Sequence, residues 1–596
     1  MGSDQNPIEK RAFRREIAER IVPAFRATWV AEPIFGRSLE WSEAQSRLGE
    51  INLQSALNAM ARLNAASVEF SFLANPRSPA GQKTMHRLTR LLFPDWVRQS
   101  AWNIYLKADN FHPLAPQACI ALTESCLRFC DRQTGIRFDW PEQCEAFSHV
   151  LLSFQSHLLR SDLIGPGTDF SALTDEQFRF LTKNYMAANY DPDGALLLIR
   201  HHMMFERPIM DGVLFQRTGT TADRWFLDVT QADPVVYRVL QLAMSKIGFG
   251  FTVESPTLDP LIDNLETALA TLRPEIAAIF RRLHSQAVIR LGEVAPAKDP
   301  ADWEAAVYSQ HYLRRRSLLQ LDEARFLCLH RQLLVEKFFG ASVHVLTDMI
   351  KEHTPPKWAA SENKRVNQLR VHFGYVFEDY LQQLLTLLFS EPEIIRRFGY
   401  RAVPESPERD ALIVVGRTAL VLEFVHHPWN LDERSNGAST PFIKHLSDNV
   451  AKTADISGLL DAGNPVADVR LSVDRILPIV VMSDVMPITE ATAPTLVRDL
   501  VALCGPGPVN GHGKIAPVQT LSLSQLENLD RIFRRPLGPD TIVEFLAKRA
   551  SRPLDRFCGS PYLDMPYGDI DRLQAFFASA DRSFLSVGPG LFLPQK

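Results

Sequence analysis

Long hydrophobic segments are missing from this sequence of 596 residues. No apolar run reaches the roughly 20 residues that a membrane-spanning helix needs. The first twenty residues, MGSDQNPIEKRAFRREIAER, are polar and lack the apolar core of a secretory signal peptide. We therefore expect a cytoplasmic protein without membrane contact.

A strong excess of positive charge is also missing. The chain has 65 lysines and arginines against 69 aspartates and glutamates, a net charge of −4. A protein that binds nucleic acid over a large part of its surface is usually basic. Any binding to DNA or RNA must therefore come from local clusters of basic residues.

Cysteines are few and do not form the pairs of a structural zinc site. The seven cysteines include no C-x-x-C pair, and their odd number favours free thiols in a reducing compartment. Cys126 and Cys130 lie one helical turn apart, near Cys119 and Cys144 in the sequence. We interpret these four as buried core residues, because free cysteine is among the most buried residue types.

The length exceeds what one hydrophobic core can hold, so we expect a multidomain protein. Amphipathic helical patterns, separated by Pro-rich breaks, predict a mainly α-helical N-terminal region with one subdomain over residues 1–165 and a second over 166–350. We expect an α/β domain over residues 351–550 and a C-terminal extension over 551–596.

The α/β domain is predicted from the order of its patterns. A helix over 363–389 precedes two strands joined at Gly416-Arg417, the shortest connection of an antiparallel pair. A helix over 442–461, a strand over 476–484, a further helix and a last strand in IAPVQTLSL follow. Ser524 and Glu527 are spaced as a capping box for the final helix. This order favours a mixed sheet flanked by helices.

Two carboxylates stand out in the hairpin. Asp410 begins the first strand and Glu423 lies late in the second, so we expect the two to face each other, with Cβ atoms about 4.5–5.5 Å apart. Glu378 lies at the edge of the apolar stripe of the preceding helix. Such acids suit a hard divalent cation that activates water against a phosphodiester. In the alternative interpretation the acids are structural, and Glu423 pairs with Lys444 or Lys452.

The helix, acid-bearing hairpin and following helix resemble the PD-(D/E)xK nuclease superfamily over about residues 365–535. The resemblance implies a restriction-endonuclease-like fold in which Asp410 and Glu423 bind Mg²⁺ or Mn²⁺, Glu378 assists, and DNA or RNA is hydrolysed. It also implies a role in restriction or anti-phage defence, where such domains occur fused to large helical regions.

The sequence departs from the superfamily at one position. The lysine expected two residues after Glu423 is Val425. The missing charge could be supplied from the next helix by Lys444 or Lys452, or His427 could act as a ligand or a base. In the third alternative the site has decayed and the domain is an interaction protein that binds nucleic acid or a protein partner.

Clusters of basic residues lie in two places. Lys364, Arg365 and Arg370 lead into the helix that carries Glu378, and Arg314, Arg315 and Arg316 form a run. We expect these six side chains to contact phosphates. In the alternative interpretation they only form ordinary solvated surfaces of the protein. The helical N-terminal region is expected to bind a partner or to control access, and the oligomeric state stays open.

Overall fold

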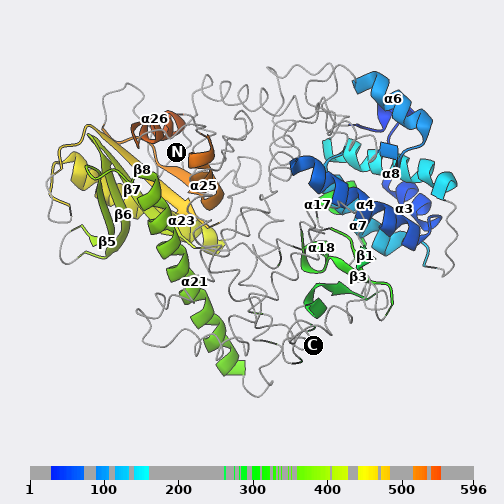
Figure 1. Cartoon of the computed structure of the whole chain (residues 1–596), viewed down its shortest axis with the longest axis horizontal. Coiled ribbons are helices and arrows are strands. Elements are labelled where there is room, and N and C mark those ends of the chain that lie inside the picture. The colour runs from blue at the N-terminus through cyan, green and yellow to red at the C-terminus, as the bar shows by residue number, and fades with distance from the viewer. Residues whose placement is uncertain are drawn as a thin grey trace, which may run out of the picture.

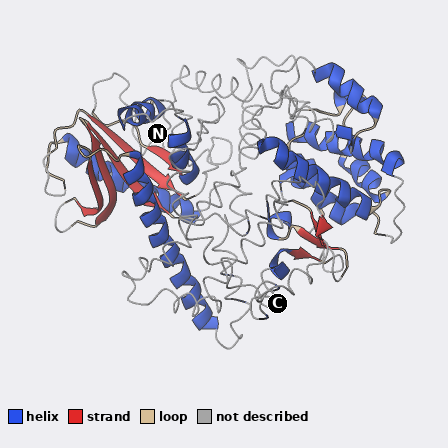
Figure 2. Ribbon diagram, in the orientation of Figure 1, coloured by secondary structure: helices blue, strands red, loops and turns tan. Residues whose placement is uncertain are grey.

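The computed structural model shows a mainly helical group of elements before residue 350 and an α/β group after it (Figures 1 and 2). None of the helices in the described ranges is long and apolar enough to cross a membrane. The structure describes residues 29–72, 89–90, 92–105, 114–132, 140–159, 261–262, 274, 281, 284–290, 299–308, 312–322, 326–330, 333–334, 337, 347, 351, 359–402, 406–426, 440–466, 471–483, 514–532 and 539–551.

Helices dominate the first group, as the sequence predicts. Helix α3 (Trp41–Gly49) has buried residues at helical spacing, which pack in a common core: Trp41, Ala44 and Leu48. A capping box between Glu40 and Glu43 fixes where that helix begins. The helices are α2 (Glu32–Phe35), α3 (Trp41–Gly49), α4 (Leu53–Phe72), α6 (Asp95–Tyr105), α7 (Pro116–Phe129), α8 (Trp140–Leu159), α17 (Trp303–Tyr308) and α18 (Tyr312–Arg315).

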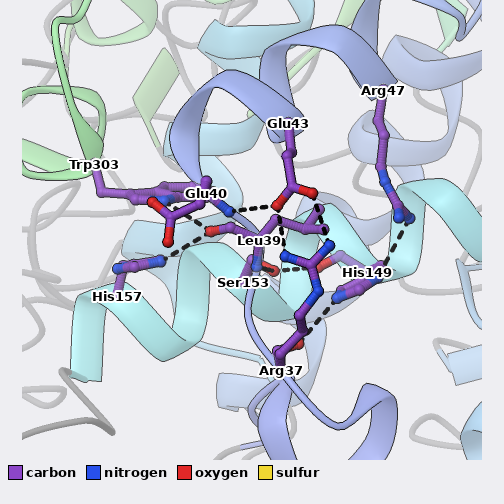
Figure 3. A network of polar contacts seen from close by, with 9 residues as sticks. All are labelled: Arg37, Leu39, Glu40, Glu43, Arg47, His149, Ser153, His157 and Trp303. Atoms are coloured by element: carbon purple, nitrogen blue, oxygen red, sulfur yellow. Dashed lines mark hydrogen bonds and ion pairs between the residues drawn. The ribbon is translucent and has the colours of Figure 1, made fainter.

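A network of polar contacts ties distant parts of this group together (Figure 3). The Leu39 amide donates to Ser153 Oγ of α8 at 3.0 Å, and the Leu39 carbonyl accepts from Trp303 Nε1 of α17 at 3.0 Å. His157 stacks on the Trp303 ring with centroids 4.4 Å apart. These contacts satisfy the backbone just before α3 and dock α17, far away in sequence, onto α8.

The expectation of a helical subdomain over residues 166–350 needs correction at four places. Short strands are found at β1 (Leu261–Ile262), β2 (Val288–Ile289), β3 (Leu318–Gln320) and β4 (Phe326–Cys328), in the sheet order β1-β4-β3-β2. The described side chains of β2, β3 and β4 are almost all buried. A short apolar run that is buried on every side has no periodicity that separates strand from helix.

The α/β group contains a mixed five-stranded sheet in the order β5-β6-β7-β8-β9. Its strands are β5 (Ile395–Arg401), β6 (Glu408–Val415), β7 (Thr418–Val425), β8 (Arg475–Met482) and β9 (Gln519–Ser522). β5, β6 and β7 are antiparallel, whereas β8 and β9 run parallel to β7. The predicted turn between β6 and β7 is confirmed, with Gly416 at a φ of 56° that glycine adopts without strain. Strand β5 is not among the predicted elements.

Helices cover both faces of this sheet. Helix α21 (Ala359–Leu388) packs with α25 (Leu523–Ile532) and α26 (Pro539–Ala550) on the face that carries Ile413 and Leu422. Helix α23 (Thr440–Asp461) packs on the other face, over Leu412 and Val421. Neighbouring strand residues thus belong to different cores, which is why β6, β7 and β8 are apolar almost throughout.

The cap of α25 differs from the prediction by two residues. The Ser522 amide donates to Gln525 Oε1 at 2.9 Å, and the Gln525 amide donates to Ser522 Oγ at 3.2 Å. The expected box of Ser524 and Glu527 is therefore wrong. Glu527 instead accepts a hydrogen bond from the Tyr380 hydroxyl at 2.9 Å inside the core.

Candidate functional site

Strands β6 and β7 part at the position of the two predicted acids. Their ladder runs from the pair Val415–Thr418 to the pair Ala411–Leu422. Asp410 and Glu423 are the next residues on each strand. Beyond this point β6 continues beside β5 and β7 continues beside β8. The two acids therefore lie next to each other at a fork in the sheet.

Asp410 is held in the fork by a backbone hydrogen bond. Its Oδ2 accepts from the Phe424 amide at 2.5 Å. This bond takes the place of the ladder bond that β7 loses where the strands separate. Burial raises the pKa of Asp410, while the Phe424 amide and the charge of Lys452 act in the opposite direction.

Glu423 is the most unusual side chain of the site. It is 1% exposed, and neither of its carboxylate oxygens has a hydrogen-bond partner among the described residues. Burial and, second, the charge of Asp410 raise the pKa of Glu423 to about 7. Buried carboxylates are normally paired or hydrogen-bonded, so these oxygens are free to accept a cation or a donor from outside the chain.

The ammonium group of a lysine on helix α23 lies beside Glu423. Lys452 Nζ lies 3.5 Å from Glu423 Oε2 and donates to Asn449 Oδ1 at 3.0 Å, with 41% of the Lys452 side chain exposed. Lys444 is exposed two turns earlier on the same helix. Of the two lysines that the sequence offers, the structure brings Lys452 to the acids. Val425, at the position of the superfamily lysine, is buried.

Arg409 and Tyr400 border the acids and were missed by the sequence interpretation. Tyr400 lies directly across from Arg409 in the β5–β6 ladder, and both are buried. Arg409 Nη2 lies 3.6 Å from Asp455 Oδ2 of α23. Burial and the charge of Glu423 raise the pKa of Tyr400. The aromatic residues Phe398 and Tyr400, which alternate after Pro392, were the available signal for a strand here.

Glu378 is not brought to the same place. It is half-buried on α21, whose apolar residues cover the sheet face opposite α23. Within the described ranges no group of three or more histidine, cysteine, aspartate or glutamate side chains is close enough to hold a metal ion. His427 lies outside the described residues.

The predicted basic clusters are on two different elements. Lys364 and Arg370 are exposed on the first half of α21. Arg315 is exposed at the end of α18, and Arg316 donates to the Val288 carbonyl at 3.3 Å, so Arg316 has a structural contact. The side chains of Arg365 and Arg314 lie outside the described residues.

The cysteines in the described part of the chain do not form a second site. The five described cysteines are free and buried, which confirms the prediction of core thiols for Cys119, Cys126, Cys130 and Cys144. Burial raises the pKa of Cys119 and of Cys144 to about 12. These thiols therefore stay protonated at neutral pH and are poor metal ligands.

Comparisons with protein-family models, with curated proteins and with solved structures found no match. The features of the chain that bear on function are therefore the positions of Asp410, Glu423 and Lys452 at the fork.

Proposed function

We propose that the α/β group is a divalent-cation-dependent phosphodiesterase that acts on nucleic acid. The observation that carries the proposal is the buried carboxylate of Glu423, whose oxygens are unpaired among the described residues, beside Asp410 and 3.5 Å from Lys452. This combines two oxygen ligands with one positive charge, at the place where a mixed sheet forks.

The residues of the fork fit a hard cation such as Mg²⁺ or Mn²⁺, because such ions prefer carboxylate oxygens. Asp410 and Glu423 would hold it, with the Phe424 amide orienting Asp410. When bound, a cation of this kind lowers the pKa of its water and offsets charge on a phosphate. Lys452 adds a second positive charge where a phosphate would carry negative charge.

A purely structural role explains the fork less well. A carboxylate kept only for folding is expected to have its oxygens satisfied by hydrogen bonds. Glu423 instead has a raised pKa, and only one ion pair, at 3.5 Å, reaches it from the described residues. A bound cation would offset the free-energy cost of burying the ionised Glu423 carboxylate. The protein would therefore be tuned for binding at some cost in stability.

Nucleic acid is the substrate class that the surroundings favour. Lys364 and Arg370 are exposed on α21, the helix that leads into the same domain. Exposed lysine and arginine side chains bind the phosphates of a polymer by charge. Restriction or anti-phage defence remains the role that the superfamily resemblance suggests, with the N-terminal helical region as the part that binds a partner or controls access.

One observation favours a non-catalytic role. Only two carboxylates meet at the fork, and no third acid, histidine or cysteine of the described ranges completes a metal-binding group. A domain that binds nucleic acid or a protein partner without cleaving it would need no more than this. The same experiment separates the two functions.

The experiment is a cleavage assay of the full chain on single- and double-stranded DNA and RNA, with Mg²⁺, with Mn²⁺ and with EDTA. We expect cation-dependent cleavage that Asp410→Asn and Glu423→Gln abolish and Glu378→Gln leaves nearly unchanged. These variants keep side-chain size, and circular dichroism checks that each is folded. Cleavage that survives Glu423→Gln contradicts the proposal. Binding without cleavage under either metal supports the non-catalytic role instead.

A further inference from the structure

A second positively charged side chain, Arg409, borders the candidate site, and the function proposed above gives it no role. The Arg409 side chain is 8% exposed and lies on β6 immediately before Asp410. Its positive charge lowers the pKa of both Asp410 and Glu423. Arg409 therefore lies near the two acids.

The donors of Arg409 are poorly used. Its Nε is buried and has no hydrogen-bond partner among the described residues. Its Nη2 is 3.6 Å from Oδ2 of Asp455, a residue whose side chain is 70% exposed. That distance is too long for a hydrogen bond, and an ion pair with an exposed partner stabilises little. A guanidinium normally donates in pairs to a carboxylate or a phosphate.

The surroundings hold Arg409 in one place. Tyr400 lies across from it on β5, and the Tyr400 hydroxyl is also buried without a hydrogen-bond partner in the described part of the chain. The tip of the guanidinium points to Asp455, which is on the exposed flank of α23. The Arg409 side chain is thus almost wholly buried, whereas the carboxylate nearest to its tip belongs to an exposed residue.

We propose that Arg409 binds a phosphate of the substrate nucleic acid, and that Asp455 is its counter-ion until the phosphate arrives. This inference rests on the proposed function for the choice of ligand. A phosphate offers two oxygens to the guanidinium, whereas Asp455 offers one distant contact. Binding therefore exchanges a weak ion pair for a strong one, and Asp455 limits the affinity of the site.

A different role for Arg409 is to offset the charge of Asp410 and Glu423 without touching a ligand. That role predicts that loss of Asp455 changes nothing in binding, because Asp455 only faces the outer end of the guanidinium. Asp448→Asn provides a matched control, since Asp448 is exposed on the same helix two turns before Asp455. It removes the same charge, and no ion pair joins it to Arg409 among the described residues.

The experiment measures binding of a labelled single-stranded DNA and of the matching RNA by fluorescence anisotropy, in EDTA so that nothing is cleaved. We expect Asp455→Asn to bind about two- to fivefold more tightly than the unaltered protein, and Asp448→Asn to bind as that protein does. Arg409→Gln should bind about tenfold more weakly or worse, and Arg409→Lys should recover part of the loss. In the double variant the gain from Asp455→Asn should disappear, because its cause is the freed arginine.

Equal affinity of Asp455→Asn and the unaltered protein would overturn the inference, as would a gain that persists without Arg409. Asp455 is at the surface, so this arm stays informative even if Arg409→Gln does not fold. The result is also separate from catalysis. A higher affinity of Asp455→Asn for nucleic acid, together with no cleavage under any metal, would support the phosphate site and contradict the phosphodiesterase proposal. Cleavage with no such gain would do the reverse.

Discussion

The ammonium group of Lys452 lies 3.5 Å from Oε2 of Glu423, although one residue is on helix α23 and the other is on strand β7. The strand itself carries Val425 where the resembled superfamily has its lysine. Helix α23 packs on the sheet face that bears Glu423, so a long side chain from this helix can take over that position. The positive charge beside Glu423 thus comes from the helix and not from the strand.

Replacement of Lys452 tests whether a side chain of helix α23 supplies the positive charge that strand β7 lacks. We expect Lys452→Met to lower the cation-dependent cleavage rate by about two orders of magnitude, because one electrostatic contact to the developing charge is lost. Lys444→Met is the matched control on the same helix and should keep its rate. Initial rates at saturating cation measure both. A loss with Lys444→Met and none with Lys452→Met would show that the wrong lysine has been assigned.

The raised pKa of Glu423 predicts an unusual dependence of stability on pH. Its ordinary value is 4.5 and its folded value is about 7, so between these values the folded protein holds a proton that the unfolded chain has released. Without divalent cation, the contribution of Glu423 is fully present below its ordinary value and is lost as the pH rises through about 7. The free energy of unfolding should be measured near pH 5 and near pH 8 for the unaltered protein and for Glu423→Gln. Between these two pH values it should fall further in the unaltered protein than in the variant, by at most about 3 kcal/mol.

Added Mg²⁺ provides the second half of this test. At about pH 8 the carboxylate is ionised, and a bound cation should raise the melting temperature of the unaltered protein. Near pH 5 the proton competes with the cation, so the rise should be smaller. A pH dependence that is identical in Glu423→Gln would show that Glu423 titrates in its ordinary range.

Tyr400 offers a test of the unpaired groups around the fork. Its hydroxyl is buried and has no hydrogen-bond partner among the described residues. Tyr400→Phe should therefore keep the free energy of unfolding or raise it by up to about 1 kcal/mol. If the hydroxyl contacts substrate, the same variant loses cleavage or binding despite its stability. A clear drop in stability in chemical denaturation would mean that the hydroxyl has a partner in the folded protein.

The start of α25 gives a test of the fold that does not depend on function. Ser522→Ala removes the side-chain oxygen that accepts from the Gln525 amide, and should cost about 1 kcal/mol of stability. Ser524→Ala, two residues later and inside the helix, is the control and should have little effect. The reverse order of the two effects would favour the capping box that the sequence alone suggested.

The sequence predicts the α/β group well where its patterns are local. The Gly416 turn, the apolar strand that ends at Met482 and the long helix with Phe377 and Leu381 are each encoded in a short stretch of chain. Strand β5 was missed because Arg396 and Arg397 interrupt its alternation. It is an edge strand, and such strands carry charged residues more often than central ones.

The residues of the candidate site, too, could be predicted only where a local pattern places them. Asp410 and Glu423 can be paired from the turn alone, because an antiparallel hairpin fixes their register. The choice between Lys444 and Lys452 depends on how α23 is rotated over the sheet, which no local pattern shows. Glu378 was grouped with the acids because it lies at the edge of the apolar stripe of its helix, from where it could reach the hairpin. Helix α21, however, packs on the sheet face opposite α23.

Calorimetric titration of metal-free protein with Mn²⁺ at about pH 8 tests the central claim most directly. The account predicts that one cation binds, that Asp410→Asn or Glu423→Gln removes the binding, and that Glu378→Gln retains it. Undiminished Mn²⁺ binding in Glu423→Gln, or no binding to the unaltered protein, would contradict the assignment of the fork as a cation site.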